Sequence, residues 1–188
     1  MLRDILKEQT HVAHQKTEGI IIRKIKAIRS EADYIEVLKG FYTYFSTVEK
    51  HMFKFITQEV LADLSDRRNS SYIQNDIEAL GGSIDDLPDA TAPVITNTID
   101  ALSAMYVLEG SIMGGPHIVK MLEKQGIDKG FSFFQGYGAD SGRMFGIFAE
   151  VLNTYGQDAT THSQAVKVAN ETFVNFGEVF TLDMAATE

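Results

Sequence analysis

The chain has 188 residues and a formal net charge of −9, and 44 % of its residues are hydrophobic. These values are ordinary for one globular domain with a sizeable core, which we expect to span residues 1–188. The absence of cysteine excludes disulfides and thiolate chemistry, and the acidic balance without a basic block argues against nucleic-acid binding.

Long segments with helical hydrophobic spacing and little proline predict an all-α bundle. Ser30, followed by Asp33, resembles a capping box that begins the second helix. Gly81 and Gly82 are typical of a helix end. The expected helices cover residues 1–28, 30–60, 72–80, 94–125, 141–155 and 163–184. The intervening segments are read as a polar turn at 62–69, with Arg67 and Arg68 solvated, a loop at 83–93, and a glycine- and phenylalanine-rich bend at 126–139.

A polar stretch at residues 7–18 is the first candidate for chemistry. His14 lies seven residues after Lys7 and four before Glu18, spacings that return to nearly the same helix face. Imidazole is a good axial ligand for haem iron, and a hydrogen-bond acceptor on its second nitrogen raises its donor strength. A lysine two turns away can meet a carboxylate of the ligand. A lone histidine is more often a surface or core residue, so both readings stay open. His11 lies off this face and is expected to be exposed.

Three glycines interrupt the helix expected over 94–125. Each costs about 1 kcal/mol relative to alanine, so their clustering indicates a bend or a close approach. Gly110 and Gly114 share a face without side chains, against which a large planar ligand can lie. Pro116 removes one N–H and favours a kink. The alternatives are close helix packing on this face, or a helix end at Gly114 and Gly115.

Together the two segments resemble the haem oxygenase family. Lys7, His14 and Glu18 resemble its proximal helix, and the sequence YVLEGSIMGG at 106–115 resembles its distal helix in bacterial members. Weaker similarity extends to residues 142–145 and 171–176. The resemblance implies a single-domain helical bundle with a glycine-kinked distal helix, and an enzyme that opens haem oxidatively to biliverdin with release of CO and iron.

The resemblance also implies roles for individual residues. His14 is the implied proximal ligand of haem iron. The implied distal wall consists of Gly110, Ser111, Gly114 and Gly115. Positions that meet the haem propionates correspond to Lys7, Tyr106 and Arg143. Further residues around the haem are Glu18, Met113, Phe173 and Phe176.

Some positions depart from the family pattern. Mammalian-type members have aspartate at the position of Ser111, although several bacterial members also have serine and are implied to use water held by backbone groups. Pro116 and His117 stand where many members have glutamine or a small apolar residue. His117 borders the glycine patch and is a competing ligand. Met113 is expected to fill or gate the distal space.

The implied reaction uses O2 and electrons from an external redox partner, such as a ferredoxin or a flavoprotein reductase. We expect a cytoplasmic protein, because no apolar run approaches the ~18 residues of a membrane helix and the N-terminus lacks a signal-peptide core. Ser111 and Pro116 favour a rival reading, a non-catalytic haem carrier or sensor. A di-iron enzyme would need paired Glu-x-x-His motifs, which the sequence lacks. A thiaminase-like activity would need a cysteine, and there is none. A helical interaction domain would leave the clustered glycines and His14 unexplained.

Overall fold

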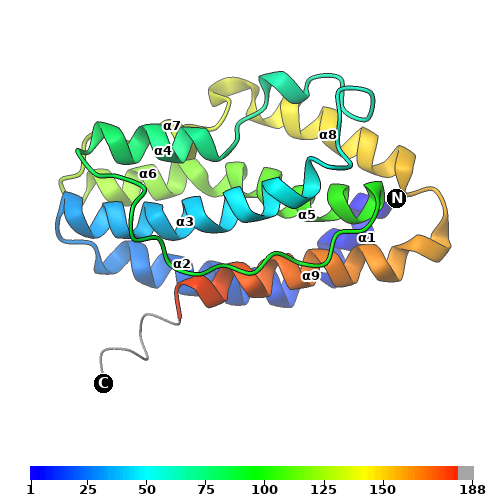
Figure 1. Cartoon of the computed structure of the whole chain (residues 1–188), viewed down its shortest axis with the longest axis horizontal. Coiled ribbons are helices and arrows are strands. Elements are labelled where there is room, and N and C mark those ends of the chain that lie inside the picture. The colour runs from blue at the N-terminus through cyan, green and yellow to red at the C-terminus, as the bar shows by residue number, and fades with distance from the viewer. Residues whose placement is uncertain (182–188) are drawn as a thin grey trace.

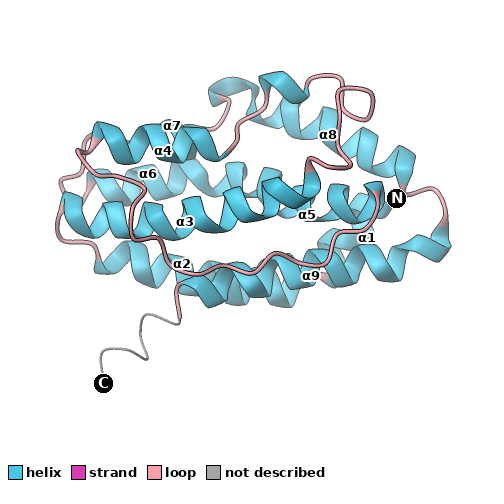
Figure 2. Ribbon diagram, viewed as in Figure 1, coloured by secondary structure: helices cyan, strands magenta, loops and turns pink. Residues whose placement is uncertain are grey.

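The computed structural model describes residues 1–181, and these are folded as helices joined by turns and loops (Figure 2). The α-helices are α1 Leu2–Gln9, α2 His11–Ala27, α3 Glu31–Met52, α4 Ser70–Ala79, α5 Thr98–Gly110, α6 Gly115–Glu123, α7 Ser132–Gln135, α8 Ser141–Tyr155 and α9 His162–Val179. Short 3₁₀ turns cover Leu64–Asp66, Ser111–Gly114, Gly138–Asp140 and Ala159–Thr161. The predicted all-α class is confirmed. None of the described helices combines the length and apolarity needed to cross a membrane.

Several helix boundaries differ from those predicted. The first helix is interrupted at Thr10, whose φ of −104° and ψ of 2° separate α1 from α2. The second ends at Met52 rather than near 60. The last α-helix ends at Val179, and the predicted end at Met184 lies outside the described residues. Sequence periodicity continued through these points because apolar residues still face the core beyond the helix ends.

Other boundaries agree with the local signals. The Ser30 hydroxyl oxygen accepts a hydrogen bond from the Asp33 N–H at 3.1 Å and caps α3. The helix α4 ends next to Gly81, whose φ of +83° is a conformation that glycine adopts without strain. The predicted span of α8 matches the observed one.

The helix α5 lies at the centre of the bundle. It packs against α3, α8 and α9, and Figure 1 shows α3 and α5 running through the middle of the molecule. Because α5 is covered on several sides, most of its residues are buried. Beside it, an aromatic cluster joins α3, α7 and the end of α9: Phe41, Phe45, Phe133, Phe134, Phe176 and Phe180.

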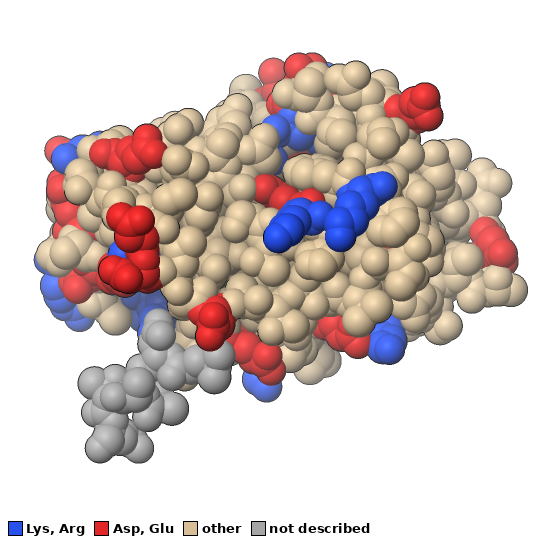
Figure 3. All heavy atoms as spheres, in the orientation of Figure 1, with Lys and Arg blue, Asp and Glu red and all other residues tan. Residues whose placement is uncertain are grey.

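Figure 3 shows how charged side chains are distributed on one face of the molecule. On the face drawn in Figure 3, basic side chains occur among acidic ones without forming a broad basic area in the described part of the chain.

Arg67 and Arg68 contradict their predicted solvation, because only 3 % and 7 % of their respective surfaces are exposed. Their positive charges are instead satisfied inside the protein by carboxylates and backbone carbonyls.

The cap at Ser30 allows a direct test of the second helix. We expect Ser30→Ala to lower the free energy of unfolding by about 1 kcal/mol, because it removes the acceptor for the Asp33 N–H. Ser30→Thr keeps a hydroxyl at this position and is expected to retain most of the stability. Urea denaturation followed by circular dichroism measures both, and equal losses in the two variants would contradict the capping role.

Candidate functional site

A cavity with a volume of about 710 Å³ lies between α1–α2 and α5–α6, with residues of α3, α7, α8 and α9 completing its lining. Its volume is in the range of small-molecule and cofactor pockets. All the predicted site residues line it except Gly115 and Arg143. Those that do are Lys7, His14, Glu18, Tyr106, Gly110, Ser111, Met113, Gly114, Phe173 and Phe176.

His14 occupies the α2 side of the cavity. Its ring lies 5.3 Å from the ring of Phe173, centroid to centroid, in a tilted arrangement. The Thr17 hydroxyl donates to the Phe173 carbonyl at 2.7 Å and fastens α2 to α9 beside it. No described residue hydrogen-bonds to the imidazole of His14, so its nitrogens are available to a ligand. His11 and His117 line the same cavity, and His11 is exposed as predicted.

The α5 side of the cavity includes a wall without side chains. A Cβ atom added at Gly110 or Gly114 would meet no atom within 4 Å, so both glycines face open space. Their backbones are right-handed helical, with φ of −60° and −85°. Glycine is therefore needed here for the missing side chain rather than for an unusual conformation.

Gly115 has a different role from the one predicted. A Cβ at this position would overlap the backbone carbonyl of Phe134, so the glycine allows α6 to pack against α7. Pro116 stands in the first turn of α6, where its missing N–H is tolerated. The predicted single helix over 94–125 is therefore α5, a 3₁₀ turn at Ser111–Gly114, and α6. The interruption comes before the proline.

Two cations line the cavity from α1. Arg3 and Lys7 are one helical turn apart, and Tyr106 of α5 also lines the cavity. Burial raises the pKa of Tyr106, and the charge of nearby Arg3 works in the opposite direction. Arg3 was missed in the sequence, although its spacing of four from Lys7 was a usable signal. Arg143 is exposed and pairs with Asp140 at 3.0 Å, outside the cavity lining.

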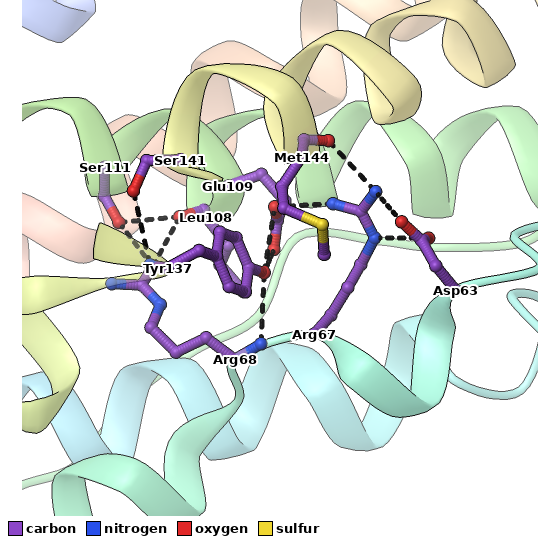
Figure 4. Close-up of polar contacts among 9 residues, drawn as sticks. All are labelled: Asp63, Arg67, Arg68, Leu108, Glu109, Ser111, Tyr137, Ser141 and Met144. Atoms are coloured by element: carbon purple, nitrogen blue, oxygen red, sulfur yellow. Dashed lines mark hydrogen bonds and ion pairs between the residues drawn. The ribbon is translucent and has the colours of Figure 1, made fainter. Parts of the chain in front are cut away.

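A largely buried group of charged and polar residues lies at the C-terminal end of α5, outside the cavity lining (Figure 4). We call Asp63, Arg67, Arg68, Glu109 and Tyr137 the arginine network. Arg67 donates to Glu109 at 2.8 Å and to both oxygens of Asp63 at 2.8 and 2.9 Å. The Tyr137 hydroxyl donates to Glu109 at 3.0 Å. This network connects three parts of the chain: the segment before α4, the C-terminal end of α5 and the segment before α8.

Burial controls the ionisation of this network. It lowers the pKa of the Arg68 guanidinium to about 10, which leaves the group charged at neutral pH. It also raises the pKa of Glu109, against the opposing attraction of Arg67 and Arg68. Sequence reasoning missed the network, although a glutamate inside the apolar segment 98–110 was a signal that a buried cation would be needed.

Metal ligands are not grouped elsewhere in the described chain. Within residues 1–181, no cluster of three or more histidine, aspartate or glutamate side chains is arranged to hold a metal ion.

Comparison with known proteins relates the whole arrangement to one family. The family model described as Heme oxygenase matches residues 1–182. The solved haem oxygenase of Neisseria meningitidis, in its NO- and CO-bound forms, is 19 % identical, with a TM-score of 0.85 over 98 % of this chain and 92 % of its own. A comparison with curated proteins gave no match.

Two further solved structures share the fold. The haem oxygenase of the cyanobacterium Synechocystis, in complex with haem, is 18 % identical, with a TM-score of 0.77 over 98 % of this chain and 93 % of its own. The haem oxygenase of Leptospira interrogans is 16 % identical, with a TM-score of 0.76 over 96 % and 98 % of the two chains. At these identities the similarity establishes the fold.

Two substitutions distinguish the packing role of Gly115 from the cavity-lining role of Gly110. We expect Gly115→Ala to lower the free energy of unfolding by about 1–3 kcal/mol, because its methyl group collides with the Phe134 backbone. Gly110→Ala is expected to leave stability unchanged or to raise it by up to about 1 kcal/mol, since its methyl group enters open space within helical backbone. Thermal and urea denaturation measure both variants. Equal destabilisation would contradict the separate roles.

Proposed function

This chain belongs to the haem oxygenase family, and we propose that haem occupies the cavity between α1–α2 and α5–α6 with His14 as its axial iron ligand. The family's reaction is the oxidative degradation of haem, and the match over residues 1–182 assigns this activity to the chain. The observation that carries the proposed site is that His14 and the two side-chain-free glycines, Gly110 and Gly114, line one cavity of about 710 Å³.

The chemistry of the lining fits the parts of haem. The neutral imidazole of His14 suits the iron. The aromatic side chains of Phe173 and Phe176 suit the faces and edges of the ring. The cations Arg3 and Lys7 suit the propionates, so we infer that a bound haem would have these carboxylates towards α1. Tyr106 extends that polar end.

The glycine wall restricts what can bind beside the iron. Gly110 and Gly114 would leave room for a flat ring close to the backbone, and the backbone there would exclude large groups beside it. When bound, haem supplies the redox chemistry with O2, and we infer that the electrons come from an external redox partner, a ferredoxin or a reductase. The chain's own task is to ligate, orient and enclose the substrate. Met113, 58 % exposed, stands at the edge of this space.

Haemin titration tests the iron ligand. We expect a Soret band that saturates at one haem per chain, and we expect His14→Ala to lose the spectrum of an imidazole-ligated haem. His11→Ala and His117→Ala are matched controls, because both histidines line the same cavity, and both should keep the spectrum. Loss in His117→Ala alone would assign the ligand to α6. The absence of a saturable band in the unaltered protein would overturn the proposed site.

Turnover separates the enzyme from a haem carrier. In air with ascorbate or a ferredoxin–reductase system, we expect the Soret band to decay as a biliverdin band rises. Stable haem binding without decay would favour the carrier on this fold.

The propionate end gives a second prediction. We expect Arg3→Met and Lys7→Met each to raise the haemin Kd by about threefold to tenfold, since each removes a partly exposed charge pair. Arg143→Met is the control and is expected to leave the Kd unchanged, because Arg143 lies outside the cavity lining. A larger effect of Arg143→Met than of the α1 variants would place the propionates towards α8 instead.

A further inference from the structure

Arg68 makes direct hydrogen bonds to the end of α5. One of its terminal nitrogens donates to the Leu108 carbonyl and to the Ser111 hydroxyl, both at 3.0 Å, and the other donates to the Phe133 carbonyl at 2.9 Å. The guanidinium also stacks 3.9 Å from the ring centre of Phe133. A single buried side chain therefore joins α5, the 3₁₀ turn and α7.

The contact with Ser111 has a defined direction. A guanidinium has only donors, so the Ser111 oxygen must accept from Arg68. The Ser111 hydroxyl in turn donates its proton to the Leu108 carbonyl at 2.6 Å. Since its only proton is engaged, Ser111 can offer just its second lone pair to the cavity that it lines.

The backbone of Arg68 is fixed as well. Its N–H donates to the Tyr137 hydroxyl at 3.0 Å, and that hydroxyl donates to Glu109. Glu109 is held by Arg67 at 2.8 Å. Glu109 and Ser111, the residues on either side of Gly110, are thus held by hydrogen bonds from Arg67 and Arg68 (Figure 4).

We propose that Arg68 is a positioning residue for haem degradation: it holds the turn Ser111–Gly114 against the cavity and fixes Ser111 as a hydrogen-bond acceptor towards the bound substrate. The inference rests on the proposed haem site and goes beyond it, since Arg68 does not line the cavity itself. A water molecule or other donor near Ser111 is consequently oriented with a proton towards its oxygen.

The first measurement uses the haem-free protein. In Arg68→Met we expect amide hydrogen exchange at residues 111–114 to accelerate by about tenfold relative to exchange in the rest of α5, the loss expected for charged hydrogen bonds. Arg68→Lys keeps the charge but not the planar fork, and we expect it to restore only part of the protection. The control is Asp100→Asn, a buried polar change at the other end of α5 that makes no contact with the turn.

The second measurement is the ratio of biliverdin isomers formed from haem, which does not depend on how much protein is folded. We expect Arg68→Met and Ser111→Ala to broaden the product from one dominant isomer to a mixture, and the double variant to equal Arg68→Met. Asp100→Asn should lower stability and leave the ratio unchanged.

The outcomes separate this inference from the proposed function. Local acceleration at 111–114 together with a changed isomer ratio supports it. Acceleration spread evenly along α5, or an unchanged ratio in both Arg68 variants, overturns it and leaves Arg68 a general stabiliser. If Arg68→Met does not fold, Arg68→Lys and Ser111→Ala decide by the same two criteria. If the unaltered protein binds no haem, the proposed function fails, and the exchange data still report on the turn.

Discussion

The bend between α5 and α6 depends on a buried cation. A central helix that is interrupted inside a protein core leaves polar groups near the break, and such groups must be satisfied without water. Arg68 satisfies the Leu108 carbonyl and the Ser111 hydroxyl from behind, and Arg67 neutralises Glu109 next to them. The cost of burying two guanidinium groups is offset in part by their carboxylate and carbonyl partners, while the buried Nε of Arg68 has no partner among the described residues. The bare glycine wall on the opposite face depends on this support.

The C-terminal end of α5 therefore has two roles: it lines the cavity, and it is hydrogen-bonded to the arginine network. The face towards the cavity lacks side chains at Gly110 and Gly114 and leaves space for a flat ligand. Outside the cavity lining, Glu109 of α5 and the two arginines before α4 make the hydrogen bonds that fix the backbone of that wall. Where Gly110 and Gly114 line the cavity, its shape is set by the placement of the backbone and not by side-chain rotamers.

Local sequence signals predicted much of this arrangement, and long-range contacts account for the differences. The Ser30 cap, the end of α4 at Gly81, and His14 with Gly110 and Gly114 all follow from neighbouring residues. The burial of Arg67 and Arg68 could not be deduced locally, because their partners lie on α5 and α7, about 40 to 65 residues away in the chain. The role of Gly115 depends likewise on the carbonyl of Phe134, and nothing near Gly115 in the sequence indicates it.

The interruption at Thr10 separates Arg3 and Lys7, which line the cavity from α1, from His14 on α2. Arg3 and Lys7 belong to α1, which is anchored by the fully buried Leu2 and Leu6, whereas His14 belongs to α2. The groups suited to the two ends of one ligand are thus carried on separately anchored segments. Replacement of a residue in α1 can alter how far the cations reach, and so the rotation of a bound ring in its own plane, while the imidazole on α2 keeps its place.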